Sequence, residues 1–136
     1  MAAFNKFNSF VENLAEKVHD LGSDALKLAL TNSAPVASNT VLANITEISY
    51  TNCSSRAVTV TSSSQSSGTY SLVANDPVLT ASGGSIAAFR YVVLYNDTPT
   101  SPADPLIGWW DYGSSVTVND GETFTVDFGS SVLTIV

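Results

Sequence analysis

The hydrophobic positions of this chain follow one period before Gly22 and another after it. Up to that glycine, apolar residues recur at alternating steps of four and three, which is the spacing of one face of a helix. The residues of this stripe are Phe7, Val11, Leu14, Val18 and Leu21. Phe4 and Phe10 widen the stripe, which favours packing against a sheet or against a second molecule. Because Gly22 stands where a glycine often ends a helix, we expect residues 1–22 to form an N-terminal helix.

After Gly22 the apolar residues alternate with polar ones, as they do in β-strands with one buried face. The serine-rich stretch Ser62–Gly68 interrupts this alternation and is expected to be a polar turn or a flexible tip. The segment "SIAAFRYVVLYND" is apolar at both its odd and its even positions, which is typical of a strand covered on two sides. We expect a facing sheet to cover one side, and the N-terminal helix is the candidate for the other. The clearest strand segments are residues 26–31, 57–61, 69–74, 85–97, 105–113, 116–118 and 124–128.

The C-terminal part is expected to contain a β-hairpin. Val116 and Val118 lead into the turn residues Asn119–Glu122, and Phe124, Val126 and Phe128 lead back. The Asp-Gly pair in this turn supplies the backbone freedom that a tight turn requires. The predicted fold class is therefore mainly β. We expect an antiparallel β-sandwich of about seven or eight strands with one N-terminal α-helix packed on it, in a single domain over residues 1–136, divided into the helix (1–22) and the sandwich (23–136).

Two adjacent tryptophans in "PLIGWWDYG" pose the main question about binding. Neighbouring residues of a strand point to opposite faces, so Trp109 and Trp110 cannot both lie on one flat surface. Asp111 shares the parity of Trp109 and prefers water, so we expect Trp110 and Tyr112 to point inward. Trp109 then faces solvent or a partner or, if the strand is central, lies under the helix.

Charge is scarce and unevenly distributed. Charged residues make up 12% of the 136-residue chain and hydrophobic residues 44%, with a net charge of −7. From residue 91 onward there are six acidic side chains and no basic one. Binding to nucleic acid requires clustered lysine and arginine, so we expect no nucleic-acid partner. No apolar run approaches the roughly 20 residues of a membrane span, and the N-terminus has no secretory signal pattern; we expect synthesis in a cytoplasm and no membrane partner.

The candidate chemistry is sparse. The only histidine is His19 and the only cysteine is Cys53, so an internal disulfide and a cysteine-rich zinc site are excluded. His19 is expected to be a partly exposed residue at the end of the helix. A Ser-His-Asp triad is not excluded by spacing, but the chain has no nucleophile-elbow, phosphate-loop, dinucleotide or calcium-loop motif. We expect neither enzymatic activity, nor a metal site, nor a cofactor.

Three segments are similar to the small virion structural proteins of tailed bacteriophages, a group that includes capsid decoration or cement proteins. They are "MAAFNKFNSFVENLAEKVHDLGSDALKLALTNSAPVASNTVLANITEI", "SGTYSLVANDPVLTASGGSIAAFRYVVLYNDT" and "DPLIGWWDYGSSVTVNDGETFTVDF". The resemblance covers nearly the whole chain and departs from the group at Ile48–Arg56, where a longer glycine-rich segment is expected. It carries no catalytic motif.

The resemblance implies a head decoration protein that binds the outer capsid lattice and stabilises it, with the major capsid protein and copies of itself as partners. The expected location is the virion. The alternative is a tail or fibre-associated module that binds a host glycan, through Trp109, Asp111 and Tyr112, or another tail protein. A small hydrolase using His19 is a third, weaker hypothesis. The candidate partner contacts are the apolar residues of the N-terminal helix, the C-terminal segment and the outer strand face: Phe4, Phe7, Phe10, Trp109, Val132 and Ile135.

Overall fold

A computed structural model describes residues 2–136 of the chain. In this part the fold is mainly β, with ten short strands, one α-helix and one 3-10 helix. The helices are α1 (Asn8–Ala15) and η1 (Leu42–Asn44). The strands are β1 (Asn5–Lys6), β2 (Leu26–Thr31), β3 (Ala57–Val58), β4 (Val60–Ser66), β5 (Thr69–Ala74), β6 (Val78–Thr80), β7 (Ile86–Asn96), β8 (Leu106–Val118), β9 (Thr123–Thr125) and β10 (Leu133–Ile135).

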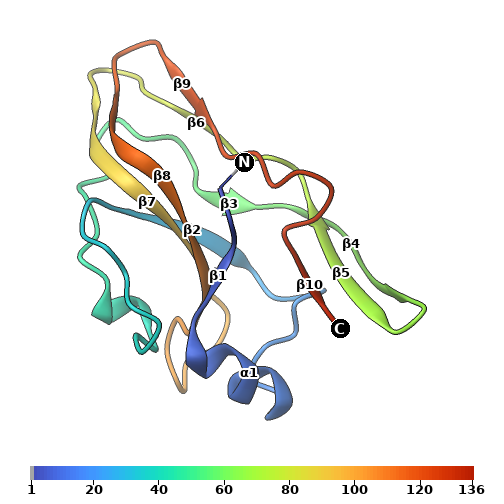
Figure 1. The fold of residues 1–136 in the computed structure, drawn as a ribbon. Helices are drawn as coiled ribbons and strands as arrows, with labels where there is room; N and C mark the ends of the chain where they lie inside the picture. Colours follow the sequence, from blue (N-terminus) through green and yellow to red (C-terminus); the bar gives the residue numbers. More distant parts are fainter. Residues whose placement is uncertain (1) are drawn as a thin grey trace.

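The strands form three antiparallel sheets. The largest has five strands in the order β1-β8-β7-β2-β3, the second has the order β10-β5-β4, and the third pairs β6 with β9. The long strands β7 and β8 lie side by side in the five-stranded sheet. The β4–β5 hairpin projects from the side of the molecule away from these two strands (Figure 1). The predicted antiparallel β-sandwich with a helix packed on it is confirmed, although the strands are more numerous than expected and several span only two or three residues.

The N-terminal helix is shorter than the expected residues 1–22, because α1 covers only Asn8–Ala15. At its start, Asn5 and Lys6 pair with the outer edge of β8, since an unpaired strand edge offers backbone hydrogen bonds to an extended segment. At its end, Lys17 adopts a φ of 70° and the Val18 N–H donates to the Asn13 carbonyl at 2.8 Å. This is the left-handed helix ending that a glycine usually forms, so the helix ends at Ala15, seven residues before Gly22.

The expected C-terminal hairpin is wrong in its pairing, although its turn is present. The Glu122 N–H donates to the Asn119 carbonyl at 2.8 Å, and Gly121 has a φ of 83°. After the turn, β9 pairs with β6 and not with β8, so the chain passes from one sheet to another. Phe124 is thereby placed against Phe89 of β7, with ring centroids 5.1 Å apart. Packing of the half-buried Phe124 against the fully buried Phe89 favours the crossing over a local hairpin.

Ser62–Ser66 was expected in a turn, but β4 continues through these residues. Its hydroxyl-rich side chains are exposed, and β4 pairs in register with β5 as far as Ser66 opposite Thr69. Only Ser67 and Gly68, both with positive φ, form the turn. The alternation of buried and exposed positions is absent here because the projecting hairpin has little to pack against, so periodicity gave no signal.

The hydrophobic core lies on both faces of the five-stranded sheet. The larger cluster fills the space between this sheet and the two smaller ones. The smaller cluster lies on the other face and includes Phe7, Ile45, Val93 and Tyr95. Two-sided burial of β7 is thus confirmed, but Ile45, from the connection after β2, and Phe7, just before α1, cover the second face. The helix itself packs on β8.

Candidate functional site: an aromatic cavity at the edge of β8

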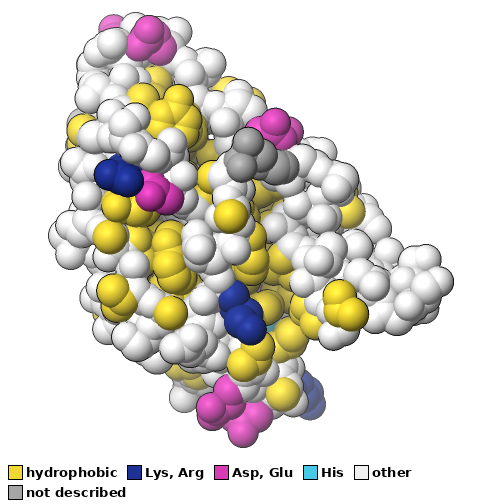
Figure 2. Space-filling model, viewed as in Figure 1, with side chains coloured by type: hydrophobic (Ala, Val, Ile, Leu, Met, Phe, Trp, Pro, Cys, Tyr) yellow, Lys and Arg dark blue, Asp and Glu magenta, His cyan; other side chains and the backbone are white. Residues whose placement is uncertain are grey.

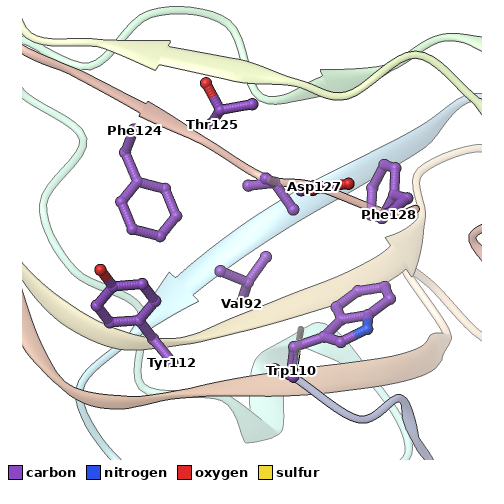
Figure 3. A pocket seen from close by; sticks show the side chains of 9 residues that line it. Val92, Trp110, Tyr112, Phe124, Thr125, Asp127 and Phe128 are labelled. Atoms are coloured by element: carbon purple, nitrogen blue, oxygen red, sulfur yellow. The ribbon is translucent and has the colours of Figure 1, made fainter.

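A cavity of about 230 Å³ opens beside the outer edge of β8. It lies between β8 and the segment that runs from β9 toward β10, with Val92 of β7 between them (Figure 3). Aromatic side chains dominate it. The residues that line it are Ala2, Val92, Trp110, Tyr112, Phe124, Thr125, Val126, Asp127 and Phe128.

Two aromatic pairs flank the cavity. Tyr112 from β8 and Phe124 from β9 meet edge to face with ring centroids 5.2 Å apart. At the other end, Trp110 and Phe128 are 5.5 Å apart. Figure 3 shows Val92 between the two pairs, while the side chain of Thr125 points away from the cavity. A ligand in the cavity would therefore contact both the faces and the edges of aromatic rings. One residue of each pair belongs to β8.

Tyr112 forms the rim of this cavity, and its position corrects the expectation that it points into the core. Its side chain is 56% exposed. In the β7–β8 ladder, Tyr91 pairs with Asp111 and Phe89 pairs with Val116, so β8 carries extra, unmatched residues between these pairs. Such a bulge bends a strand and redirects its side chains. Trp110 and Tyr112 still share one sheet face, since both line the cavity, but Tyr112 lies next to the bulge, at the exposed rim and not in the core.

Asp111 is held on the strand surface by two neighbours. Arg90 on β7 donates to both of its carboxylate oxygens, at 2.8 and 3.1 Å, and the Gly113 N–H donates at 2.8 Å. The Arg90 guanidinium and the Gly113 N–H lower the pKa of Asp111. Its carboxylate is therefore engaged within the protein, which argues against Asp111 as one of the three predicted glycan-binding residues. Trp109 and Tyr112 of that set are also separated, because Trp109 packs with the smaller core cluster on the opposite sheet face.

Three of the six predicted partner contacts are core residues of this chain. Phe7, Phe10 and Val132 are 0%, 3% and 4% exposed, so their side chains are not available to a partner. Val132 leads into β10, which pairs with β5; the C-terminal segment is therefore a strand of the same domain. The reason for the misassignment is shared by all three: an apolar stripe indicates burial but not against which molecule.

The other predicted contacts, Phe4, Trp109 and Ile135, are half-buried. Phe4 lies against Trp110, at 5.4 Å between ring centroids, next to the cavity. A Cβ atom on Gly108 would overlap the Phe4 ring and lie 2.8 Å from the Asn5 carbonyl oxygen. The glycine is therefore what allows the N-terminal arm, residues 2–6, to lie flat against β8. Phe128 beside Trp110 and Phe124 beside Tyr112 were not expected from the sequence, because the contacts that join them are long-range.

His19 is buried, not partly exposed as expected, and it belongs to a polar network. It is 6% exposed, and its Nδ1 lies 3.1 Å from the Asn96 amide nitrogen. The same nitrogen donates to Asp24 Oδ2 at 2.7 Å, and Asn96 Oδ1 accepts from the Thr98 N–H at 3.1 Å. These partners fix the amide orientation, so Nδ1 must accept and the proton is on Nε2.

The network does not assemble a hydrolytic triad from the described residues. Asp24 reaches His19 only through the Asn96 amide. The buried Nε2 has no hydrogen-bond partner among residues 2–136, whereas a triad needs a nucleophile there. Burial lowers the pKa of His19, and the nearby Asp24 carboxylate opposes this only in part.

His19 also lines a second cavity, of about 390 Å³, between the α1–β2 connection and the β4–β5 hairpin. Its walls include Leu14, Leu21, Tyr70 and Ile135. The Nε2 atom of His19 has almost no accessible surface, so a ligand in this cavity could not form a hydrogen bond with it. Within residues 2–136 no group of three or more histidine, cysteine, aspartate or glutamate side chains is placed to hold a metal ion.

Across the described part of the chain, no helix has the length and apolar character required to cross a membrane. Comparisons with protein-family models, with curated proteins and with solved structures gave no match to this chain.

Proposed function

We propose that this protein is a structural protein of a tailed-bacteriophage virion, specifically a decoration protein that binds the outer capsid and stabilises it. Its partners are the major capsid protein and copies of itself. The observation that carries the proposal is the aromatic cavity beside the part of the outer edge of β8 that β1 leaves unpaired. An exposed aromatic anchor beside a free strand edge is suited to holding another protein segment.

The sequence resemblance to small virion proteins supports the same class, and so does the surface chemistry. Few charges have to be desolvated on contact, because charged residues are 12% of the chain. The serine-rich edge of β4 is exposed and supplies hydroxyl groups for hydrogen bonds across a subunit boundary. A protein that binds the assembled lattice and not free subunits stabilises that lattice by mass action.

The location and copy number of the chain in purified virions test this proposal. Heads and tails are separated, and the chain is counted in each by quantitative mass spectrometry. A decoration protein is expected on heads in symmetric, high copy number, and heads that lack it are expected to open at lower temperature. Absence from heads would overturn the proposal, and a few copies confined to tails would favour the alternative.

The alternative is a tail or fibre-associated module that binds a host glycan or another tail protein. One observation favours the glycan: Trp110 and Tyr112, both on β8, line a single cavity with the Asp127 carboxylate. Aromatic faces with a nearby carboxylate suit a sugar ring. The expected result for this function is glycan-array binding that is lost in Tyr112→Ala and retained in Trp109→Phe, since Trp109 lies on the opposite face.

A further inference from the structure

The N-terminal arm of this protein already demonstrates how the edge of β8 binds an extended segment. Asn5 and Lys6 pair with Trp109 and Gly108, and the Asn5 side-chain amide donates to the Trp109 carbonyl at 3.3 Å. Phe4 sits over Gly108. Backbone pairing along the strand together with side-chain seats beside it is the mode of β-strand addition.

Beyond Trp109 the same edge of β8 forms no further ladder pairs with residues 2–136, although the N-terminal arm continues beside it and Ala2 lines the cavity. The aromatic cavity opens beside this uncovered part, and Tyr112 stands at its rim with 56% of its side chain exposed. Figure 2 shows hydrophobic side chains reaching the surface in the middle of this face of the molecule. Unpaired β8 backbone and an apolar cavity therefore lie at one place, where an incoming segment would replace residues 2–4 of the arm or continue beyond them.

The size of the cavity indicates what it holds. Small-molecule sites usually enclose about 300–1,000 Å³, whereas a cavity of about 150 Å³ already accommodates benzene. At about 230 Å³, this cavity fits one aromatic or large aliphatic side chain. It suits the anchor residue of a peptide better than a cofactor or an oligosaccharide.

The charge around the cavity indicates which side chains the bound peptide carries next to its anchor residue. Residues 91–136 carry six acidic side chains and no basic one. Of these acids, Asp111 is neutralised by Arg90 and Asp97 by Lys27, and these are the only ion pairs among residues 2–136. Asp127 lines the cavity. Asp76 is close to it, since its carboxylate accepts from the Phe128 N–H at 2.9 Å.

We infer that this edge binds an extended segment of another protein in which a bulky apolar side chain is followed or preceded by a lysine or arginine. The apolar side chain fills the cavity between the Trp110–Phe128 and Tyr112–Phe124 pairs, and the basic side chain pairs with Asp127. A second copy of this chain is a poorer occupant, because copies paired through this acidic half would place acid against acid. The identification of the major capsid protein as the source of this segment rests on the proposed function. The apolar and basic character of the segment is inferred from the cavity and its charges, independently of that function.

A random-peptide display selection on the isolated protein tests the inference without any virion. The expected result is enrichment of peptides that combine an aromatic or large aliphatic residue with lysine or arginine. Tyr112→Ser is expected to weaken their binding about tenfold or more, as loss of an aromatic anchor does. Asp127→Asn is expected to weaken it about two- to fivefold at low salt, as loss of one exposed ion pair does. Val36→Ser, an equally exposed apolar residue outside the cavity, is the matched control and is expected to change nothing.

Hydrogen exchange locates the bound peptide. Backbone amides of β8 beyond Trp109 are expected to exchange more slowly in the complex, whereas those of β4, an exposed edge without an aromatic cavity, keep their rates. The inference is overturned if no peptide distinguishes the wild type from Tyr112→Ser, if acidic peptides are selected, or if Tyr112-dependent binding proves to be self-association or glycan binding. Selected peptides that behave as expected while virions lack the chain would contradict the proposed function alone.

Discussion

The rings of Phe7 and Trp109 lie 4.6 Å apart between centroids, on the face of the five-stranded sheet that points away from the larger core cluster. Phe7 is fully buried, and its N–H donates to the Ile107 carbonyl at 3.2 Å. The N-terminal segment is thereby fastened to β8 by an aromatic contact and a backbone hydrogen bond. Trp109 is covered by the chain's own Phe7 and is half-buried, which answers the question that the adjacent tryptophans raised.

Phe7→Ala is expected to destabilise the protein strongly. Truncating a fully buried phenylalanine removes apolar contacts and leaves a cavity, which costs about 3–5 kcal/mol in the free energy of unfolding. Urea denaturation followed by tryptophan fluorescence measures this, since Trp109 reports on the contact directly. Val11→Ala is the matched control, because Val11 in α1 is 50% exposed and is expected to cost less than about 1 kcal/mol. Equal losses in the two variants would contradict the packing of Phe7.

Gly108→Ala is expected to displace the N-terminal arm. The new methyl group would overlap the Phe4 ring, and such overpacking costs about 1–3 kcal/mol. Because the closest clash is with the Phe4 ring and only a lesser one is with the Asn5 carbonyl oxygen, the double variant Phe4→Ala/Gly108→Ala is expected to lose less stability than the sum of the two single variants. Thermal unfolding of the four proteins completes the cycle. Additive losses would show that Gly108 is required for a reason other than Phe4.

Stability is expected to fall as the pH drops below about 6.5, the ordinary pKa of histidine. Burial lowers the pKa of His19 in the folded protein, so the unfolded chain binds the proton first and gains free energy relative to the folded one. The contribution is complete above the unfolded pKa and is lost as the pH falls toward the folded pKa. Protonation of Nδ1 would also place a donor against the Asn96 amide nitrogen, 3.1 Å away. Asp24 is the acidic group that opposes the shift, and Lys17 and Asp20 line the adjoining cavity.

Two measurements check this pH dependence. Because the chain has one histidine, its imidazole NMR signals titrate without overlap, and they are expected to give a pKa below 6.5 and the Nε2-protonated tautomer. In His19→Gln, the slope of unfolding free energy against pH in this range is expected to flatten. A His19 pKa above 6.5 would contradict the network as described, even if the variant does not fold.

Tyr50→Phe is expected to destabilise the protein through one hydroxyl group. The Tyr50 hydroxyl accepts from the Leu30 N–H at 3.0 Å and donates to Glu47 at 2.6 Å. Burial is the main cause that raises the pKa of Tyr50, followed by its hydrogen bond to Glu47. Removing the hydroxyl leaves the Leu30 N–H without its acceptor, which costs about 1–3 kcal/mol. Thermal unfolding measures the loss, and Tyr112→Phe, with its exposed side chain, is the control expected to be neutral.

Local chemistry in the sequence determined the type of most elements. Alternation over residues 26–31 and the two-sided apolar run from residue 85 gave β2 and β7, because side-chain periodicity reflects the pleat of the strand itself. The Asn119–Glu122 turn was predictable because Gly121 permits positive φ. The split of Trp109 and Trp110 between two sheet faces followed from the geometry of any strand.

Only the tertiary structure decided which segments meet. β9 pairs with β6, β1 takes the edge of β8, and Phe124 and Phe128 join Trp110 and Tyr112 around one cavity. These outcomes result from competition among distant strand edges and apolar faces for burial, to which local periodicity contributes nothing. The same reason explains Phe7, Phe10 and Val132: the sequence determined that they are apolar and favour burial, and the fold decided that what covers them is their own chain.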